Sequence, residues 1–400
     1  MSLKKKEYLM IRYLSFAILP VLLPGLLFAA PETTEGKKSS LAFWQKKPKS
    51  TATGAPCKNS CNYVNESRAS CSKYENNIFV EADLIYWIAK QEGNSYAATG
   101  AAITVPGTAD PITGLVPGSL ESGSIYAPNI EFRPGFKVGL GINLAHGGWD
   151  LFTNYTYFFS KAHRSVQSDD LNSSIIPIFG YGPNNSILAE TTYESGANGF
   201  VSEATASWDL HFNNINLELG KLFQTCSAWR LWMHPHFGLE ASWQKQKLNV
   251  NYEVSAISPA GTFLGNNQAL FDQTFWGVGP RTGLDTTWEC CNHLGLFADT
   301  AFALLWGQFS SHAKSYDTNT LLSYENILIA NQSYRPYTMS PVIQVDLGVE
   351  SAWLFGNTSG LVVRLGWEAQ VWFFQNQHST PIADTSLILQ GLTADFRFNF

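Results

Sequence analysis

The stretch LTADFRFNF, residues 392–400, carries the pattern on which the fold prediction rests. Every second residue in it is apolar, from Leu392 to Phe400, and polar or charged residues such as Asp395 and Arg397 stand between them. Successive side chains of a β-strand point to opposite faces, so the pattern predicts a strand with one apolar and one charged face. A soluble sheet buries the apolar face, whereas a membrane barrel turns it toward lipid. The rest of the chain distinguishes the two.

Composition and the amino terminus point to an exported protein whose surface does not mainly face water. Charged residues make up only 14% of the 400 residues, against about 25% in soluble domains, and aromatic residues also reach 14%. A basic stretch, Lys4–Lys6, precedes an apolar run that is broken by Pro20 and Pro24 and ends in small residues at Ala29, as in a secretory signal peptide. We therefore assign residues 1–29 to a signal peptide, 30–76 to a flexible periplasmic leader that contains cysteines, and 77–400 to the folded domain.

The two-residue period continues from residue 78 almost to the end, and it predicts ten strands. Their ranges are 78–90, 130–145, 149–161, 204–224, 229–247, 274–289, 293–309, 341–354, 361–375 and 386–400. The phase changes once, within 204–224, where the apolar residues Trp208 and Phe212 give way to Ile215 and Leu217. We expect a β-bulge at Asn213–Asn214 to absorb the extra residue.

The connections between these strands alternate in length. Those after the second, fourth, sixth and eighth strands are short, and the others include long segments at about 91–129, 162–203, 248–273 and 310–340. Tight periplasmic turns and long outer loops are typical of outer-membrane barrels, and an even number of strands places both termini in the periplasm. Residues 248–254 also alternate, so further strands could raise the count to twelve or more. An exported soluble β-sandwich is the alternative fold.

Aromatic residues on the apolar faces gather at two levels. The lower level holds Trp149, Trp288, Trp353 and Phe400, and the upper level holds Tyr157, Phe159, Trp208 and Trp306. Two aromatic girdles around an aliphatic band are what membrane interfaces select. The sequence therefore predicts an all-β, transmembrane, antiparallel up-and-down barrel in the outer membrane of a Gram-negative-type bacterium. Its expected partners are membrane lipid and, through the strand ending at Phe400, the barrel-assembly machinery.

Four segments resemble the Legionella-type major outer membrane protein family of pore-forming barrels, which also occurs in chlamydia-related bacteria. They are FVEADLIYWIAKQEGNSYA (79–97), FWGVGPRTGLDTTW (275–288), WEAQVWFFQNQ (367–377) and LQGLTADFRFNF (389–400). The resemblance covers about residues 78–400 and leaves out the Lys-rich leader. It implies passive diffusion through a porin-like barrel, with surface adhesion as a role discussed for some members, and it implies no catalytic residues.

The faces opposite the apolar ones carry the ionisable residues that we predict to line a pore. They are Glu81, Asp83, Lys137, Asp150, Asp209, Arg230, Glu240, Arg281, Asp285, Asp299, Asp346, Glu350, Arg364, Glu368, Asp395 and Arg397. A lipid-facing Lys or Arg would cost about 2–4 kcal/mol at the bilayer midplane, so an inward position follows. Carboxylates predominate, which favours cations. The predicted function is a mildly cation-selective outer-membrane porin for small hydrophilic solutes and ions. In the alternative, the charges pair across a narrow, plugged lumen, and the protein is a surface adhesin or a disulfide-linked structural protein.

Six cysteines form a second pattern. Cys57, Cys61 and Cys71 lie in the leader, and Cys226, Cys290 and Cys291 lie in predicted short turns. All six would be periplasmic, where disulfides persist, so we expect bridges from leader to barrel, to other envelope proteins or within a homo-oligomer. The connectivity stays open. The cysteine spacings do not match a zinc site, and neither a metal nor a cofactor is expected.

An enzyme is not expected either. Asp209 and His211 share a strand face, as do His234 and His236, but that spacing follows from any polar strand face. The sequence has no Gly-x-Ser-x-Gly elbow, phosphate loop or His-Glu-x-x-His helix. An exported acidic chain, with a net charge of −6, is not expected to bind nucleic acid. The Gly-, Pro- and Ser-rich loops 91–129 and 162–203 either constrict the pore or bind a host surface.

Overall fold

The computed structural model describes most of the chain that follows the predicted leader. The described residues are 77–100, 123–144, 148–167, 175–179, 198–224, 230–258, 261–291, 294–319, 324–355, 359–377 and 385–400. The predicted signal peptide and leader lie outside these ranges, and so do Cys57, Cys61, Cys71 and Cys226.

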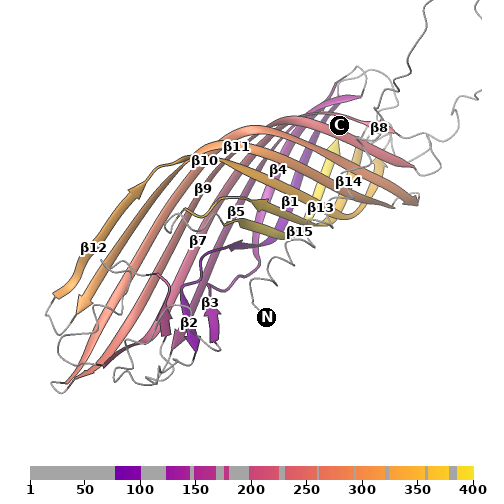
Figure 1. Cartoon of the computed structure of the whole chain (residues 1–400). Helices are drawn as coiled ribbons and strands as arrows, with labels where there is room; N and C mark the ends of the chain where they lie inside the picture. Colours follow the sequence, from indigo (N-terminus) through magenta and orange to yellow (C-terminus); the bar gives the residue numbers. More distant parts are fainter. Residues whose placement is uncertain are drawn as a thin grey trace, which may run out of the picture. The chain divides into compact units, whose positions relative to one another are not determined.

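Ten antiparallel strands close into a barrel, as Figure 1 shows. They are β1 (Asn77–Gln91), β4 (Arg133–Asn143), β5 (Trp149–Gln167), β7 (Asn198–Lys221), β9 (Leu231–Ser258), β10 (Gly261–Cys291), β11 (Leu294–Asn319), β13 (Tyr337–Phe355), β14 (Ser359–Trp372) and β15 (Leu387–Asn399). The ring is closed where β15 pairs with β1, with Asp395 opposite Asp83. The predicted all-β, ten-stranded, up-and-down barrel is confirmed.

Five short strands lie outside this ring of ten. They are β2 (Ala97–Gly100), β3 (Gly123–Tyr126), β6 (Ile175–Pro177), β8 (Phe223–Gln224) and β12 (Tyr324–Tyr334). β3, β2 and β6 continue the sheet from β7, and β12 pairs with β11.

Two of the predicted long loops, at about 248–273 and 310–340, are mostly strand, which corrects that expectation. β9 and β10 pair without a register change from Gly261 opposite Ser258 to Trp288 opposite Leu231, and β11 continues to Asn319. The alternation at 248–254 therefore belongs to the extended β9 and not to an additional strand. In Figure 1, β7, β9, β10 and β11 run far past the ends of β1, β14 and β15. We call this the extended end, and the end with Phe400 the short-turn end.

Near the short-turn end, the outside of the barrel is an apolar band. Its exposed side chains include Leu84, Leu140, Leu239, Leu347 and Leu365. Of the residues predicted for the girdles, Trp288, Trp353 and Phe400 are exposed at the short-turn side of this band, Trp306 is exposed at its other side, and Trp149, Tyr157 and Phe159 lie half-buried on the same outer face. On that other side the rings of Trp306 and Tyr337 stack at 5.4 Å, and those of Tyr155 and Trp243 at 6.2 Å.

Trp208 is the exception among the predicted girdle residues. Its side chain is only 2% exposed, inside the barrel, and donates a hydrogen bond to Gln246. β7 pairs with β5 and β9 in one register from Glu203 to Gly220, so the predicted bulge at Asn213–Asn214 is wrong. One face of β7 points inward throughout and changes from apolar residues to polar ones. Its members are Trp208, Leu210, Phe212, Asn214, Asn216 and Glu218.

An apolar layer fills the lumen next to this change. It consists of Ile85, Trp87, Phe158, Phe212, Phe275, Leu305, Phe309, Val342, Trp372 and Leu389, each no more than 2% exposed. The rings of Phe212 and Trp372 are 5.2 Å apart in a T-shaped contact. Their strands, β7 and β14, stand five positions apart in a ring of ten, on opposite walls. The contact therefore spans the lumen.

The chain after β14 folds inward over the same layer. Gln375 is fully buried, and its carbonyl accepts a hydrogen bond of 2.6 Å from the side chain of Gln273 on β10. The Gln273 amide oxygen in turn accepts from the backbone N–H of Gln377 at 2.8 Å. The connection between β14 and β15 is thus tied to another wall of the barrel.

Beyond the apolar layer, the extended end has an apolar interior of its own. Leu248, Val250 and Tyr252 of β9 are buried there with Tyr96 and Phe179, which belong to the segments around β2 and β6. The Tyr252 hydroxyl donates to the Tyr96 carbonyl at 2.6 Å and accepts from the Phe179 N–H at 3.1 Å. Burial raises the pKa of Tyr252 above its ordinary value, so the hydroxyl keeps the proton that it donates.

Candidate functional site

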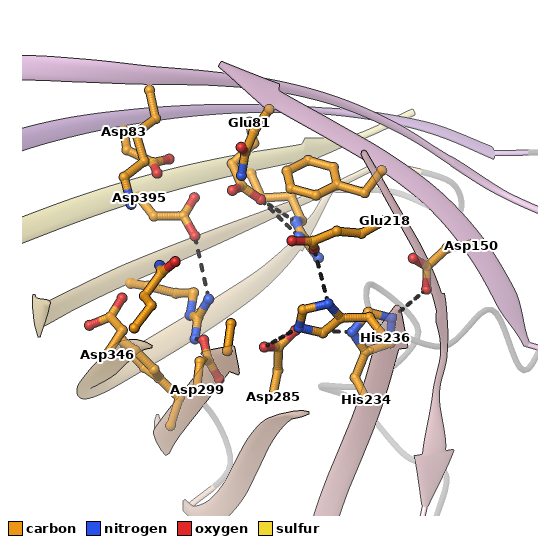
Figure 2. A pocket seen from close by; sticks show the side chains of 18 of the residues that line it. Glu81, Asp83, Asp150, Glu218, His234, His236, Asp285, Asp299, Asp346 and Asp395 are labelled. Atoms are coloured by element: carbon orange, nitrogen blue, oxygen red, sulfur yellow. Dashed lines mark hydrogen bonds and ion pairs between the residues drawn. The ribbon is translucent and has the colours of Figure 1, made fainter. Parts of the chain in front are cut away.

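The other side of the apolar layer, toward the short-turn end, holds a charged pocket of about 150 Å³ (Figure 2). The predicted pore-lining residues in its wall are Glu81, Asp83, Lys137, Asp150, Arg281, Asp285, Asp299, Asp346, Arg364, Asp395 and Arg397. Glu240, Glu350 and Glu368 are buried beside the wall as ion-pair partners. The regular alternation of the strands brings these residues together, because each occupies an inward position on its strand.

Two predicted pore-lining residues, Asp209 and Arg230, lie elsewhere. Asp209 is on the outer face of β7, in register with the exposed Lys161 and Lys247, because the absence of a bulge reverses the predicted face. Arg230 is exposed just before β9 with a φ of 44°, and its carbonyl accepts a hydrogen bond from the Glu289 N–H. Both predictions are therefore corrected.

Glu218, which the sequence interpretation missed, takes a central place in the pocket. Glu218 follows Asn214 and Asn216 at the same two-residue period, so the periodicity of the sequence could have identified it. Its carboxylate accepts from Arg281 Nε at 2.6 Å, and Arg281 Nη1 donates to Glu240 at 2.8 Å. Arg281 also donates to the Gln344 side chain at 2.8 Å. One buried guanidinium thus connects strands β7, β9, β10 and β13, with charge-assisted hydrogen bonds that compensate its burial.

Two histidines of β9 face carboxylates in the same pocket. His234 Nε2 lies 2.7 Å from Asp150 and its Nδ1 lies 3.0 Å from Asp285. His236 lies 3.5 Å from Asp285 and 3.4 Å from Glu218. Figure 2 shows Asp285 beside the two rings, and both histidines contact it. Acceptors on both ring nitrogens favour the doubly protonated His234, which then has no lone pair for a general base.

The other basic side chains of the pocket, those of Lys137, Arg364 and Arg397, also form ion pairs. Lys137 donates to Glu368 at 2.5 Å, and its ammonium lies 5.1 Å from the Trp87 ring centre, which places this pair against the apolar layer. Arg397 is bonded to Glu81 at 2.8 Å. Arg364 is bonded to Asp299 and lies near Glu350 and Asp395.

Carboxylates outnumber basic groups in and beside the pocket. The carboxylates are Glu81, Asp83, Asp150, Glu218, Glu240, Asp285, Asp299, Asp346, Glu350, Glu368 and Asp395, and the basic groups are Lys137, Arg281, Arg364, Arg397, His234 and His236. The wall reaches the short-turn end at Asn143 and Leu222.

Two of the cysteines predicted to form disulfides stand at the end of β10. Cys290 is exposed near the end of β10 and is a free thiol among the described residues. Cys291 ends the same strand. The predicted disulfide network involves the leader and stays a prediction.

An outer apolar band, two aromatic borders and a polar interior define an outer-membrane β-barrel protein. A family model described as "Legionella pneumophila major outer membrane protein precursor" matches residues 69–400. The chain belongs to this family, as the sequence motifs predicted. Among the described residues, no helix is long and apolar enough to cross a membrane.

Comparison with other proteins gives only distant likenesses. No curated protein matches the chain. The outer membrane protease OmpT from Escherichia coli is 11% identical, with 81% of this chain and 96% of that chain covered and a TM-score of 0.35. A FadL homologue from Pseudomonas aeruginosa is 8% identical, with 84% and 94% covered and a TM-score of 0.27. The P. putida toluene transporter TodX is 9% identical, with 84% and 92% covered and a TM-score of 0.25.

Proposed function

We propose that the protein is a narrow, cation-preferring diffusion channel whose lumen is closed in this conformation by the apolar layer. The observation that carries the proposal is the excess of carboxylates in a pocket inside the barrel. Burying so many like charges is costly in an interior that serves only as packing. A path for cations gives these charges a role, because rings of carboxylates favour cation entry.

The proposed channel has a definite orientation. The short-turn end faces the periplasm, so that both termini of the barrel lie there, and the extended end faces outward. The charged pocket is then a periplasmic vestibule, and the apolar layer lies between it and the outside. Lipid contacts the apolar band, and the closing strand that ends at Phe400 is the segment offered to the assembly machinery.

Opening of the channel requires the apolar layer to part. Hydrophobic constrictions block ions because water does not wet them, even where a gap exists. The Phe212–Trp372 contact joins opposite walls of the barrel within this layer. The inward-folded residues 373–377 adjoin Trp372 in the chain, so a movement of this connection would displace Trp372.

Single-channel recording in a planar bilayer tests the proposal. We expect the exported protein, purified from outer membranes, to show brief and small conductance steps whose reversal potential in a salt gradient favours cations. Trp372→Ala should raise the open fraction at least several-fold by removing the contact with Phe212. Trp353→Ala, which deletes an exposed Trp on the outer face, is the matched control and should leave gating unchanged.

Two results would contradict the proposed channel. The first is that neither the native protein nor Trp372→Ala conducts, although both remain heat-modifiable, folded barrels. The second is anion preference in the native protein. Reductant should be included in one set of records, because a change in conductance would implicate the cysteines.

A surface adhesin or a structural envelope barrel is the second candidate. The Phe212–Trp372 contact supports it, because a lumen closed from wall to wall needs no transport function. β12 supports an outward role as well, since Ile327, Leu328 and Ile329 are exposed on a strand that pairs with β11 alone among the described strands. Loss of host-cell binding when the segment 325–333 is replaced by Gly and Ser, with conductance unchanged, would favour adhesion.

A further inference from the structure

Three carboxylates meet where the first and last strands of the barrel close the ring. Glu81 and Asp83 lie on β1, and Asp395 lies on β15 directly opposite Asp83. Asp83 and Asp395 are buried, Glu81 is largely so, and each offers an oxygen atom that lies within 4.8 Å of the other two. Figure 2 shows them together at one side of the charged pocket. The three residues belong to the wall of the charged pocket.

The charge of Asp83 is not balanced by the described side chains. Asp83 is 6% exposed, and its buried Oδ1 has no hydrogen-bond partner among the described residues. Lys137 stands opposite it on β4, but the Lys137 ammonium is bonded to Glu368 at 2.5 Å. Arg397 is bonded to Glu81, and Arg364 lies 3.8 Å from Asp395 while bonded to Asp299. Like charges directly opposite each other in a sheet are destabilising, and a buried charge needs a partner.

We propose that Glu81, Asp83 and Asp395 bind a calcium ion that joins β1 to β15 at the closing seam. Carboxylate oxygens are the ligands of hard divalent cations. Calcium accepts irregular sets of oxygen ligands at about 2.3–2.6 Å, whereas magnesium demands near-ideal octahedral geometry and gives up its waters reluctantly. Carboxylates that project from two paired strands, with oxygens all within 4.8 Å of one another, fit the more permissive calcium. Water from the pocket completes the six to eight ligands that calcium takes.

In this proposal, the clustered carboxylates between β1 and β15 have a structural role, because the ion that they bind joins the two strands. β1 and β15 are the two ends of the barrel sequence, and their pairing is the step that closes the ring. An ion bound by both strands in the closed state stabilises that state by mass action. This role does not depend on conduction, so a protein without channel activity could still carry the site.

Calcium titration of the purified full barrel tests the proposal. The exported protein is freed of metal by dialysis against a chelator, and calcium binding is measured by calorimetry together with the temperature at which the heat-modifiable band shifts on a gel. We expect one calcium ion per chain and an upward shift of that temperature by several degrees. Magnesium should bind at least tenfold more weakly.

Two variants locate the ion. Asp83→Asn should abolish the calcium-dependent shift; because it removes a repulsive charge, it should fold without metal. Asp346→Asn removes a carboxylate from the same pocket but outside the cluster, and it should retain the shift. The proposal is overturned if the native protein binds no calcium, since a shared proton then neutralises the cluster. It is equally overturned if Asp83→Asn binds calcium as the native protein does, since the ion then lies elsewhere.

Discussion

The part of the barrel near the short-turn end and the extended end are built from the same strands, yet their inner and outer faces have opposite polarity. On β9, Phe237 and Leu239 face outward in the first part while His236 and Glu240 face inward. Beyond Trp243, the outward residues are polar, as at Lys247, and the inward ones are apolar. β9 and β10 keep one register through this change, so no bulge causes it.

The difference between the two parts follows from the solvent outside. Where hydrocarbon surrounds the barrel, outward side chains must be apolar and charges collect in the lumen. Where water surrounds it, the strands form an ordinary apolar core and present polar side chains outward. The border of Trp243, Trp276 and Trp306 marks the level at which one solvent replaces the other.

The largest effect is expected from the polar interior. Arg281→Met leaves Glu218 and Glu240 buried without their shared guanidinium, and we expect a loss of about 3–5 kcal/mol in the free energy of unfolding. Arg230→Met, at an exposed position, should change it by less than about 0.5 kcal/mol. Guanidinium unfolding in lipid vesicles measures both. Equal effects would show that the Arg281 network does not stabilise the barrel.

Two variants on the outer face of β9 test most directly whether the polarity of the strand faces reverses beyond Trp243. Leu239→Arg places a charge in the apolar band and should cost about 2–4 kcal/mol. Asn249→Arg places the same charge on the same face of β9 beyond Trp243, where we expect a change within about 0.5 kcal/mol. The two variants are compared by the same vesicle unfolding. If Asn249→Arg were as costly as Leu239→Arg, the hydrocarbon would extend past the tryptophan border.

In the apolar interior of the extended end, the Tyr252 hydroxyl joins the segments around Tyr96 and Phe179 by hydrogen bonds. Tyr252→Phe leaves the Tyr96 carbonyl and the Phe179 N–H without the Tyr252 partner, and we expect a local loss of about 1–3 kcal/mol. Hydrogen exchange of the segments around Tyr96 and Phe179 should become faster, while that of β14 and β15 stays unchanged. Uniform exchange across the barrel would contradict a separate core at the extended end.

The smallest effects are expected from single carboxylates, and they distinguish those inside the barrel from those on its outer face. Asp209→Asn alters the outer face of β7 and should leave both stability and ion preference unchanged within error. Asp346→Asn alters the pocket wall and should lower cation preference in the bilayer records. A clear change of ion preference in Asp209→Asn would place that residue in the conduction path.

The strands, their faces near the short-turn end and the family can all be predicted from the amino-acid sequence. These features depend on local sequence patterns, because the two-residue period and the aromatic residues at the borders occur within each strand. The closing strand 392–400 has the predicted alternation, with Thr393 and Asp395 buried and Leu392 and Phe398 exposed.

How the interior is filled follows from the tertiary structure alone. Periodicity identifies two faces but not which one is inside, so the sequence predicts an outward position for Trp208, whereas the barrel places Trp208 and Phe212 in its lumen. The contact of Phe212 with Trp372, and the meeting of Glu81, Asp83 and Asp395, join residues that are distant in the sequence. Such contacts depend on ring closure and lumen width, which arise from the number and pairing of all the strands together.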